Sequence, residues 1–177
     1  EPFTDVDIVN NIDFTSTAGA FTGNVGDYTV EFEPTATALQ NSGAGYIVAS
    51  LGEASGYVPY AVYMANDSYM KANPDVMEAF TRAIYRGQIW VAEHSAEESA
   101  EVILPQFQDS DLETLTSIIA RYQAQDTWKT TPDFSEEGFT LIQDIMEQGG
   151  ELSARVPFDD FVDNTYAKTV MAEGISE

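Results

Sequence analysis

The chain has 177 residues, of which 44% are apolar, so it is long enough to form one ordinary domain or two small lobes with a sizeable core. Its 30 acidic and 7 basic residues give a formal net charge of −23, which repels nucleic acid phosphates and anionic lipid head groups and argues against both as partners. Because the chain contains no cysteine, disulfides, thiolate nucleophiles and cysteine-based zinc sites are excluded.

The sequence contains no run of 18 apolar residues, so it predicts no membrane-spanning helix. The first residues, EPFTDVD, lack the positive and apolar regions of a signal peptide, and they include no initiator methionine. We therefore expect a mature form or a fragment of a longer protein.

The first third of the chain is predicted to alternate short strands and short helices. Tyr28, Val30 and Phe32 alternate with polar residues, which is the period-two pattern of a strand. Pro34 suits the first turn of a following helix. The order predicts an α/β fold with partly parallel pairing, and residues 52–59 resemble a linker. The predicted strands are 6–10, 28–32, 46–50 and 60–65, with helical composition at 15–24 and 34–43.

The remainder of the chain is predicted to be helical. A long helix starts at Asn73-Pro74, where a capping residue precedes a proline at the first helical position. The sequences SAEE at 95–98 and SDLE at 110–113 both fit a capping box that opens a helix. A further helix is expected from about Ser135 to Gln148. The last predicted helix is outlined by Phe158, Phe161, Val162, Tyr166 and Val170.

Catalytic and metal-binding groups are scarce in this sequence. The single histidine, His94, falls at the end of the long helix, where a cation suits the helix dipole, and we expect a solvated structural role for it. The acidic runs at Glu97–Glu101 and Asp159–Asp160 are interpreted as solvated helix faces. The sequence therefore predicts no catalytic residue, no metal site and no cofactor.

Candidate binding residues lie where the first two predicted strands end, at 10–17 and 32–35. In open α/β sheets, ligands gather beyond the carboxyl ends of strands, because loop amides and helix N-termini converge there. The alternative is that Asp13, Thr15 and Glu33 only cap helices and form turns.

Taken in order, these motifs resemble the second half of ABC-transporter substrate-binding proteins of the nitrate/sulfonate/taurine type, a group that includes thiamine-pyrimidine-precursor binders. In that family a W-E-P corner follows a strand, and a strand near P-Y precedes ENPE and a long helix with an aromatic residue near its end. Phe32 departs from the pattern, because the family usually has tryptophan there. The matching positions are Gly26, Asp27, Phe32, Glu33, Pro34, Pro59, Tyr60, Asn73, Pro74, Asp75 and Trp90.

The resemblance implies an α/β, two-lobed fold of the periplasmic-binding-protein type (type II), here a fragment that lacks the N-terminal part. Residues 1–58 would belong to the second lobe, and residues 59–177 would form the mostly helical C-terminal part of the first. It also implies an extracytoplasmic location, often with a lipid anchor. The implied partners are a small-molecule ligand, a membrane permease and the missing N-terminal half of the fold.

The segments expected to line the cleft, 10–17, 31–36 and 56–63, contain no Arg or Lys. An anion would lack a charge partner there, whereas carboxylates accept hydrogen bonds from amino groups and aromatic rings stack on planar rings or cover cations. We therefore expect a small amine-bearing or aminopyrimidine-like ligand. The predicted ligand-binding residues are Asp13, Phe14, Thr15, Glu31, Phe32, Glu33, Tyr57 and Tyr60.

Two other functions stay open at this point. An enzyme of the related pyrimidine-synthesis group would share the fold, but that chemistry would want a cysteine-rich iron site and histidines, and the chain has no cysteine and one histidine. An acidic interaction module without a small ligand would place the same aromatic residues in an ordinary core. The solute receptor is the prediction that the motifs favour.

Overall fold

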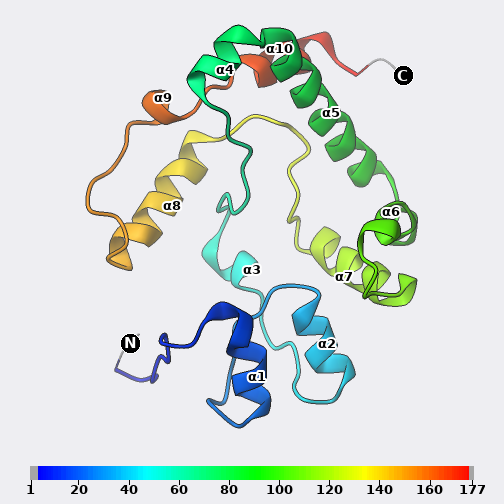
Figure 1. The fold of residues 1–177 in the computed structure, drawn as a ribbon, viewed down its shortest axis with the longest axis vertical. Coiled ribbons are helices and arrows are strands. Elements are labelled where there is room, and N and C mark those ends of the chain that lie inside the picture. The colour runs from blue at the N-terminus through cyan, green and yellow to red at the C-terminus, as the bar shows by residue number, and fades with distance from the viewer. Residues whose placement is uncertain (1–3, 176–177) are drawn as a thin grey trace.

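The computed structural model describes residues 4–175, which form helices joined by segments without regular structure (Figure 1). In this view the segments that follow α3 and α7 run through the middle with helices on both sides of them, whereas the loop between α8 and α9 lies on the outside. The helices are α1 (Thr17–Thr22), α2 (Thr35–Asn41), α3 (Leu51–Ser55), α4 (Asp67–Ala72), α5 (Pro74–Glu93), α6 (Ala96–Ile103), α7 (Leu112–Ala124), α8 (Glu136–Gln148), α9 (Phe158–Phe161) and α10 (Thr165–Glu173), with 3-10 turns η1 (Phe14–Ser16) and η2 (Leu104–Gln106).

Several helix boundaries confirm the capping predictions. Helix α5 begins at Pro74, as predicted, and ends before His94, but the Asn73 side chain does not cap it and donates instead to the Tyr69 carbonyl at 2.9 Å. Helix α6 opens with the predicted capping box, in which the Ser95 hydroxyl accepts a hydrogen bond from the Glu98 amide and the Glu98 carboxylate accepts one from the Ser95 amide. Helix α8 is capped by Ser135, whose hydroxyl accepts from the backbone of Gly138. Local sequence was sufficient here because each cap lies within one helical turn of its partner.

Two predictions about helices are wrong. The cap of α7 is Asp111 and not Ser110, because the Asp111 carboxylate accepts a hydrogen bond from the Thr114 amide at 2.8 Å. The last predicted helix is two helices, α9 and α10, separated at residues 162–164. Asn164 holds this break, since its side-chain amide both accepts from and donates to the backbone of Phe134 at 2.8 Å.

The four segments predicted as strands form no strand among residues 4–175, so the described part is helical and the predicted α/β class is not seen in it. These segments are 6–10, 28–32, 46–50 and 60–65, and no ladder of backbone hydrogen bonds joins them to one another within the described residues. A strand is stable only when a neighbouring backbone satisfies its amides and carbonyls. These segments therefore have the alternating sequence pattern of strands, but no neighbouring strand pairs with them among the described residues.

The described core lies between pairs of helices. Helix α6 packs against α7, where Ala100, Leu115 and Ile119 are buried together, and α5 packs against α10, which buries Ala167 and Val170. The predicted apolar face of residues 112–122 is confirmed by the burial of Leu115 and Ile119. The first pair is local, because α6 and α7 are neighbours in the chain, whereas α5 and α10 are far apart in the sequence.

The candidate site is positioned by two corners. At the first, the peptide bond from Glu33 to Pro34 is cis and Pro34 directly precedes α2. At the second, the segment of Tyr57 to Pro59 lies against the first turn of α8, so closely that a Cβ atom added to Gly138 would be 3.3 Å from the Tyr57 carbonyl and 3.2 Å from the Pro59 ring. Glycine at this position allows the close approach.

Candidate functional site

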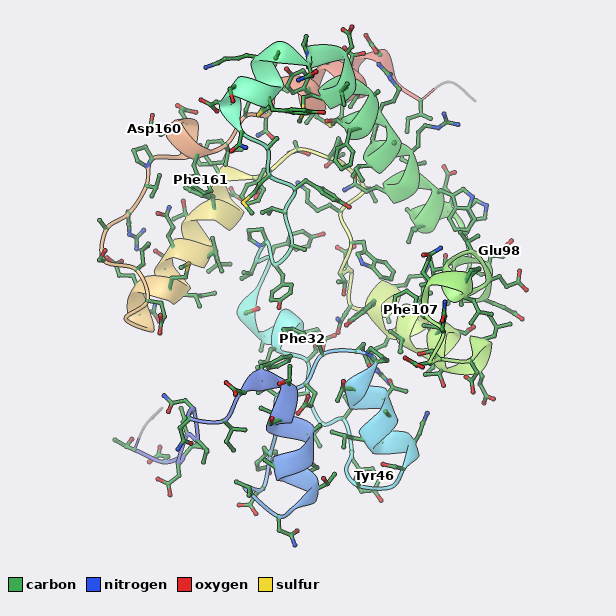
Figure 2. The ribbon with its side chains drawn as sticks, viewed as in Figure 1. Phe32, Tyr46, Glu98, Phe107, Asp160 and Phe161 are labelled. Carbon is green, nitrogen blue, oxygen red and sulfur yellow. The ribbon has the colours of Figure 1, made fainter. Side chains whose placement is uncertain are left out.

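Three aromatic residues of the predicted site form one cluster. The Phe32 ring lies between those of Phe14 and Tyr60, with centroid distances of 5.0 Å to each and tilted ring planes. The rings come from three different segments, and Phe32 lies near the start of α1 (Figure 2). Phe14 is 52% exposed, Phe32 44% and Tyr60 78%. The cluster therefore presents aromatic surface to solvent instead of filling a core.

Glu33 is held in a network of its own. Its side chain is 8% exposed and forms an ion pair with Arg121, which lies in the last turn of α7. The same carboxylate accepts hydrogen bonds from the Thr37 amide and hydroxyl, both at 3.0 Å, and Arg121 also donates to that hydroxyl at 3.0 Å. Thr37 is itself buried. The Glu33 carboxylate is therefore already paired, and it fixes the corner before α2.

Burial and nearby carboxylates raise the pKa values of two tyrosines. Burial raises the pKa of Tyr122 above its ordinary value of 10.0, and the charge of Glu33 raises it further. Burial likewise raises the pKa of Tyr57, with an added contribution from the charge and hydrogen bond of Asp126. In both cases a neighbouring negative charge disfavours the phenolate. The Tyr57 hydroxyl thus interacts with Asp126 in the turn after α7. Among the described residues, the Tyr57 ring does not stack on Phe14, Phe32 or Tyr60.

The remaining predicted residues lie near the cluster in sequence and are less constrained. Asp13 and Thr15 are exposed, and the Asp13 side chain does not cap the turn that follows it. Glu31 is half-buried and accepts a hydrogen bond from the Thr29 hydroxyl at 2.8 Å. Neither the Asp13 nor the Glu31 carboxylate belongs to the network around Glu33.

Two surface hollows lie elsewhere. One of about 610 Å³ lies along α5 and includes Arg82 and Arg86, and one of about 410 Å³ lies along α8 and includes Glu136 and Asp144. Neither hollow is lined by a predicted site residue. The aromatic cluster is therefore an open surface feature that these hollows do not enclose.

Sequence reasoning missed Arg121, Thr37 and Tyr122. It is correct that the predicted lining segments contain no Arg or Lys, but the structure brings Arg121 to Glu33 from α7, so the site does not lack a cation. No local pattern in the sequence links Arg121 to Glu33, because the two residues are 88 positions apart. Thr37 carried a weak local signal, because it lies four residues after Glu33 at the start of a helix.

His94 occupies the place predicted for it at the end of α5. Its ring stacks on that of Trp90, with centroids 3.9 Å apart, and Nδ1 lies 2.7 Å from the Trp90 carbonyl oxygen. Within residues 4–175, no group of three or more His, Cys, Asp or Glu side chains is arranged to hold a metal ion.

The chain belongs to the family described as NMT1/THI5 like, whose model matches residues 2–98, more than half of the chain. This family has a periplasmic-binding-protein-like fold. The chain is also 40% identical over 173 residues to a protein of Bacillus subtilis (strain 168) named "Putative binding protein YtlA". That match covers 98% of this chain and 52% of the relative.

The chain thus spans about half the length of the curated relative that it matches. No solved structure matches it. In the part of the chain that the structure describes, no helix combines the length and apolar character needed to cross a membrane.

Proposed function

We propose that this chain is part of the extracytoplasmic solute-binding component of an ABC importer. In this proposal two lobes of a type II binding-protein fold close over a small ligand, and the closed form docks on a membrane permease. Residues 1–58 contribute to one lobe and residues 59–177 to the other. Support comes from the family, from the name of the relative and, above all, from the exposed aromatic cluster.

The aromatic cluster suits a flat or cationic ligand. Three rings that meet at 5.0 Å spacings with half or more of two of them exposed offer faces and edges for stacking. The electron-rich faces of Phe32 and Tyr60 also attract a cationic nitrogen. An amine-bearing or aminopyrimidine-like solute combines both properties, and it remains the proposed ligand class.

In this proposal, Glu33 has a structural role, and Asp13 and Glu31 bind the ligand. Glu33 orients the corner, because Arg121 and Thr37 occupy its oxygens. Asp13 and Glu31 are left to accept hydrogen bonds from an amino group of the ligand. An amine is still favoured over an anion, since Arg121 is itself paired with a carboxylate.

A binding role is favoured over an enzyme of the same family. The relative is named as a binding protein. The one histidine lies against Trp90 at the end of α5, and no cysteine is present in the chain, so a cysteine-rich iron site has no ligands here. A purely acidic interaction module is less well supported, because it would place these three aromatic side chains in an ordinary core, whereas they are exposed.

The test is a calorimetric and thermal-shift screen of the full-length protein against aminopyrimidines, polyamines, sulfonates and nitrate. A cationic or aminopyrimidine ligand should raise the melting temperature, and above Kd the stabilisation should grow with the logarithm of the ligand concentration. Stabilisation by anions alone would refute the ligand class but leave a receptor. Stabilisation by none of the four classes would refute the proposed function.

The same assay locates the ligand. Phe32→Ala removes the central ring and should weaken binding about tenfold, the upper end of what one aromatic pair contributes. Phe107→Ala is the matched control, because Phe107 is 41% exposed and lies beside α6 and α7 (Figure 2). Equal affinities for the two variants would rule out the cluster as the site.

A further inference from the structure

The last turn of α7 and the turn that follows it contact both segments that bring Phe32 and Tyr60 together. Arg121 reaches the first segment, where its Nη1 group pairs with the Glu33 carboxylate and donates to the Thr37 hydroxyl at 3.0 Å. Asp126 reaches the second segment, where its carboxylate accepts a hydrogen bond from a tyrosine hydroxyl. One end of one helix therefore connects two parts of the chain that are far from it in sequence.

The contact at Glu33 acts on the residue before it in the chain. Glu33 follows Phe32 directly, and its carboxylate also accepts hydrogen bonds from the Thr37 amide and hydroxyl. The Glu33 side chain is 8% exposed and Phe32 is 44% exposed, so the carboxylate points into the molecule while the ring lies at its surface. The bonds with Thr37 and Arg121 therefore fix the corner from inside and leave the ring accessible to a ligand.

The segment that carries Tyr60 is held at two points just before it. The Tyr57 hydroxyl is bound to Asp126, and the Tyr57 carbonyl and the Pro59 ring lie against the first turn of α8. Tyr60 follows directly, and the centroid of its ring lies 5.0 Å from that of Phe32. A displacement of Tyr57 is therefore passed along a short, anchored segment to the Tyr60 ring.

The backbone at Asp126 has a conformation that is unusual for an aspartate. Helix α7 ends in a Schellman arrangement, in which the Thr127 amide donates to the Tyr122 carbonyl at 3.0 Å and the Asp126 amide donates to the Gln123 carbonyl at 3.2 Å. The φ angle of Asp126 is +52°, in the left-handed region where glycine is the usual residue. Strained residues of this kind cluster at functional sites. The bond to Tyr57 supplies a reason for an acid at this position.

We infer that the C-terminal end of α7 positions the aromatic cluster, with Arg121 and Asp126 as its two positioning residues. Arg121 acts on the Phe32 ring through the ion pair with Glu33. Asp126 acts on the Tyr60 ring through the segment that it holds by a tyrosine hydroxyl. The effect on ligand affinity rests on the proposed function, whereas the effect on the arrangement of the rings does not.

The first experiment compares Arg121→Lys with Arg121→Met in the full-length protein. Because the contacts with Glu33 and Thr37 both come from Nη1, a lysine ammonium can replace it, whereas methionine cannot. The readout is the nuclear Overhauser effect between ring protons of Phe32 and Tyr60, recorded at temperatures where unfolding curves show each variant to be folded. We expect these signals in the wild type and in Arg121→Lys, and their marked weakening in Arg121→Met. Absence of the signals from the wild type, or equal signals in both variants, would overturn the inference.

The second experiment compares Asp126→Gly with Asn24→Gly. Asn24 is the matched control, because it ends α1 with the same pattern of backbone bonds, has a φ of +62° and is exposed. Glycine relieves the left-handed backbone at both positions, so the melting temperature should hold or rise in both variants. Only Asp126→Gly should weaken the signals between Phe32 and Tyr60. If both variants keep these signals, the aspartate merely ends α7 and has no positioning role.

Ligand affinity connects the positioning role to the proposed function. The probes are 4-aminopyrimidine and spermidine, each titrated calorimetrically into the full-length protein. For a probe that the wild type binds, Arg121→Met and Asp126→Gly should each weaken binding about fivefold, within the contribution of one aromatic pair, while Arg121→Lys and Asn24→Gly should stay within about twofold. If neither probe binds but the ring signals respond as expected, the proposed ligand class fails and the positioning role stands. If a probe binds equally to all four variants, the positioning role fails and the proposed function stands.

Discussion

Glu33 and Arg121, which are 88 positions apart in the sequence, form an ion pair that joins the corner before α2 to the last turn of α7. The pair is asymmetric, because the Glu33 side chain is 8% exposed and that of Arg121 is 28% exposed. The acid is thus the more deeply buried partner, and it depends on Arg121 and Thr37 for compensation.

We expect Arg121→Met to destabilise the chain by roughly 2–4 kcal/mol, because it leaves the Glu33 carboxylate mostly buried without its cation. The measurement is urea unfolding followed by far-ultraviolet circular dichroism. The double variant Glu33→Gln/Arg121→Met should recover part of the loss, since no unpaired charge then remains.

Arg155→Met is the control for this prediction. Arg155 also pairs with two carboxylates, those of Asp144 and Glu147, but all three side chains are at least 40% exposed. Exposed pairs contribute little to stability, so the control should lose much less than Arg121→Met. Similar losses for the two variants would show that the pair with Glu33 has no special role.

The caps of α6 and α7 give a second prediction. The motif at 110–113 suggested Ser110 as the cap of α7, but Asp111 performs this role. Asp111→Ala should therefore lower the melting temperature measurably, and Ser110→Ala should leave it nearly unchanged. A larger effect at Ser110 would restore the interpretation from sequence and contradict the observed hydrogen bond.

Asp111 also predicts a pH dependence. Its hydrogen bonds with Thr114 hold its pKa below the ordinary value of 3.8. A lowered pKa in the folded state means that the stabilisation is present above pH 3.8 and is lost as the pH falls through the lower folded value. The difference in urea midpoint between the wild type and Asp111→Asn should therefore be constant near neutral pH and shrink below that point.

Comparison with Asp111→Asn is necessary because acid also relieves the repulsion that comes from a net charge of −23. That general effect acts on both proteins alike and cancels in the difference between them. A difference that grows as the pH falls would mean that the Asp111 carboxylate does not stabilise the folded state through its charge.

The sequence was a good guide where the partners are close neighbours in the chain. The capping box at Ser95 and the start of α5 at Pro74 depend on groups within a single turn, and both were predicted. The pairing of Arg121 with Glu33 could not be predicted, because no local pattern links residues that far apart.

The predicted strands fail for a related reason. The alternation at Tyr28, Val30 and Phe32 is correct as a pattern, but a strand exists only with a partner backbone, and no such partner lies beside it among the described residues. Of the residues predicted to bind a ligand, the structure brings only some together. Phe14, Phe32 and Tyr60 come together, whereas Glu33 and Tyr57 are engaged by Arg121 and Asp126.

The contact of α8 with the segment that leads to Tyr60 gives the last prediction. A methyl group at Gly138 would lie 2.9 Å from the Ser135 hydroxyl and 3.2 Å from the Pro59 ring, and the hydroxyl cannot move away without losing its capping bond to the Gly138 amide. Gly138→Ala should therefore cost roughly 1–3 kcal/mol by overpacking and, by displacing Pro59, weaken any ligand held by Tyr60.

Gly87→Ala separates this effect from the general preference of helices for alanine. Gly87 lies inside α5 with no atom within 4 Å of an added Cβ, so the substitution should stabilise the chain by about 0.5–1 kcal/mol. Opposite signs at the two glycines, measured by urea unfolding, are the expected result. If Gly138→Ala also stabilised the chain, α8 would not lie against the Tyr57–Pro59 segment as described, and the position of Tyr60 beside Phe32 would lose its support from that side of the molecule.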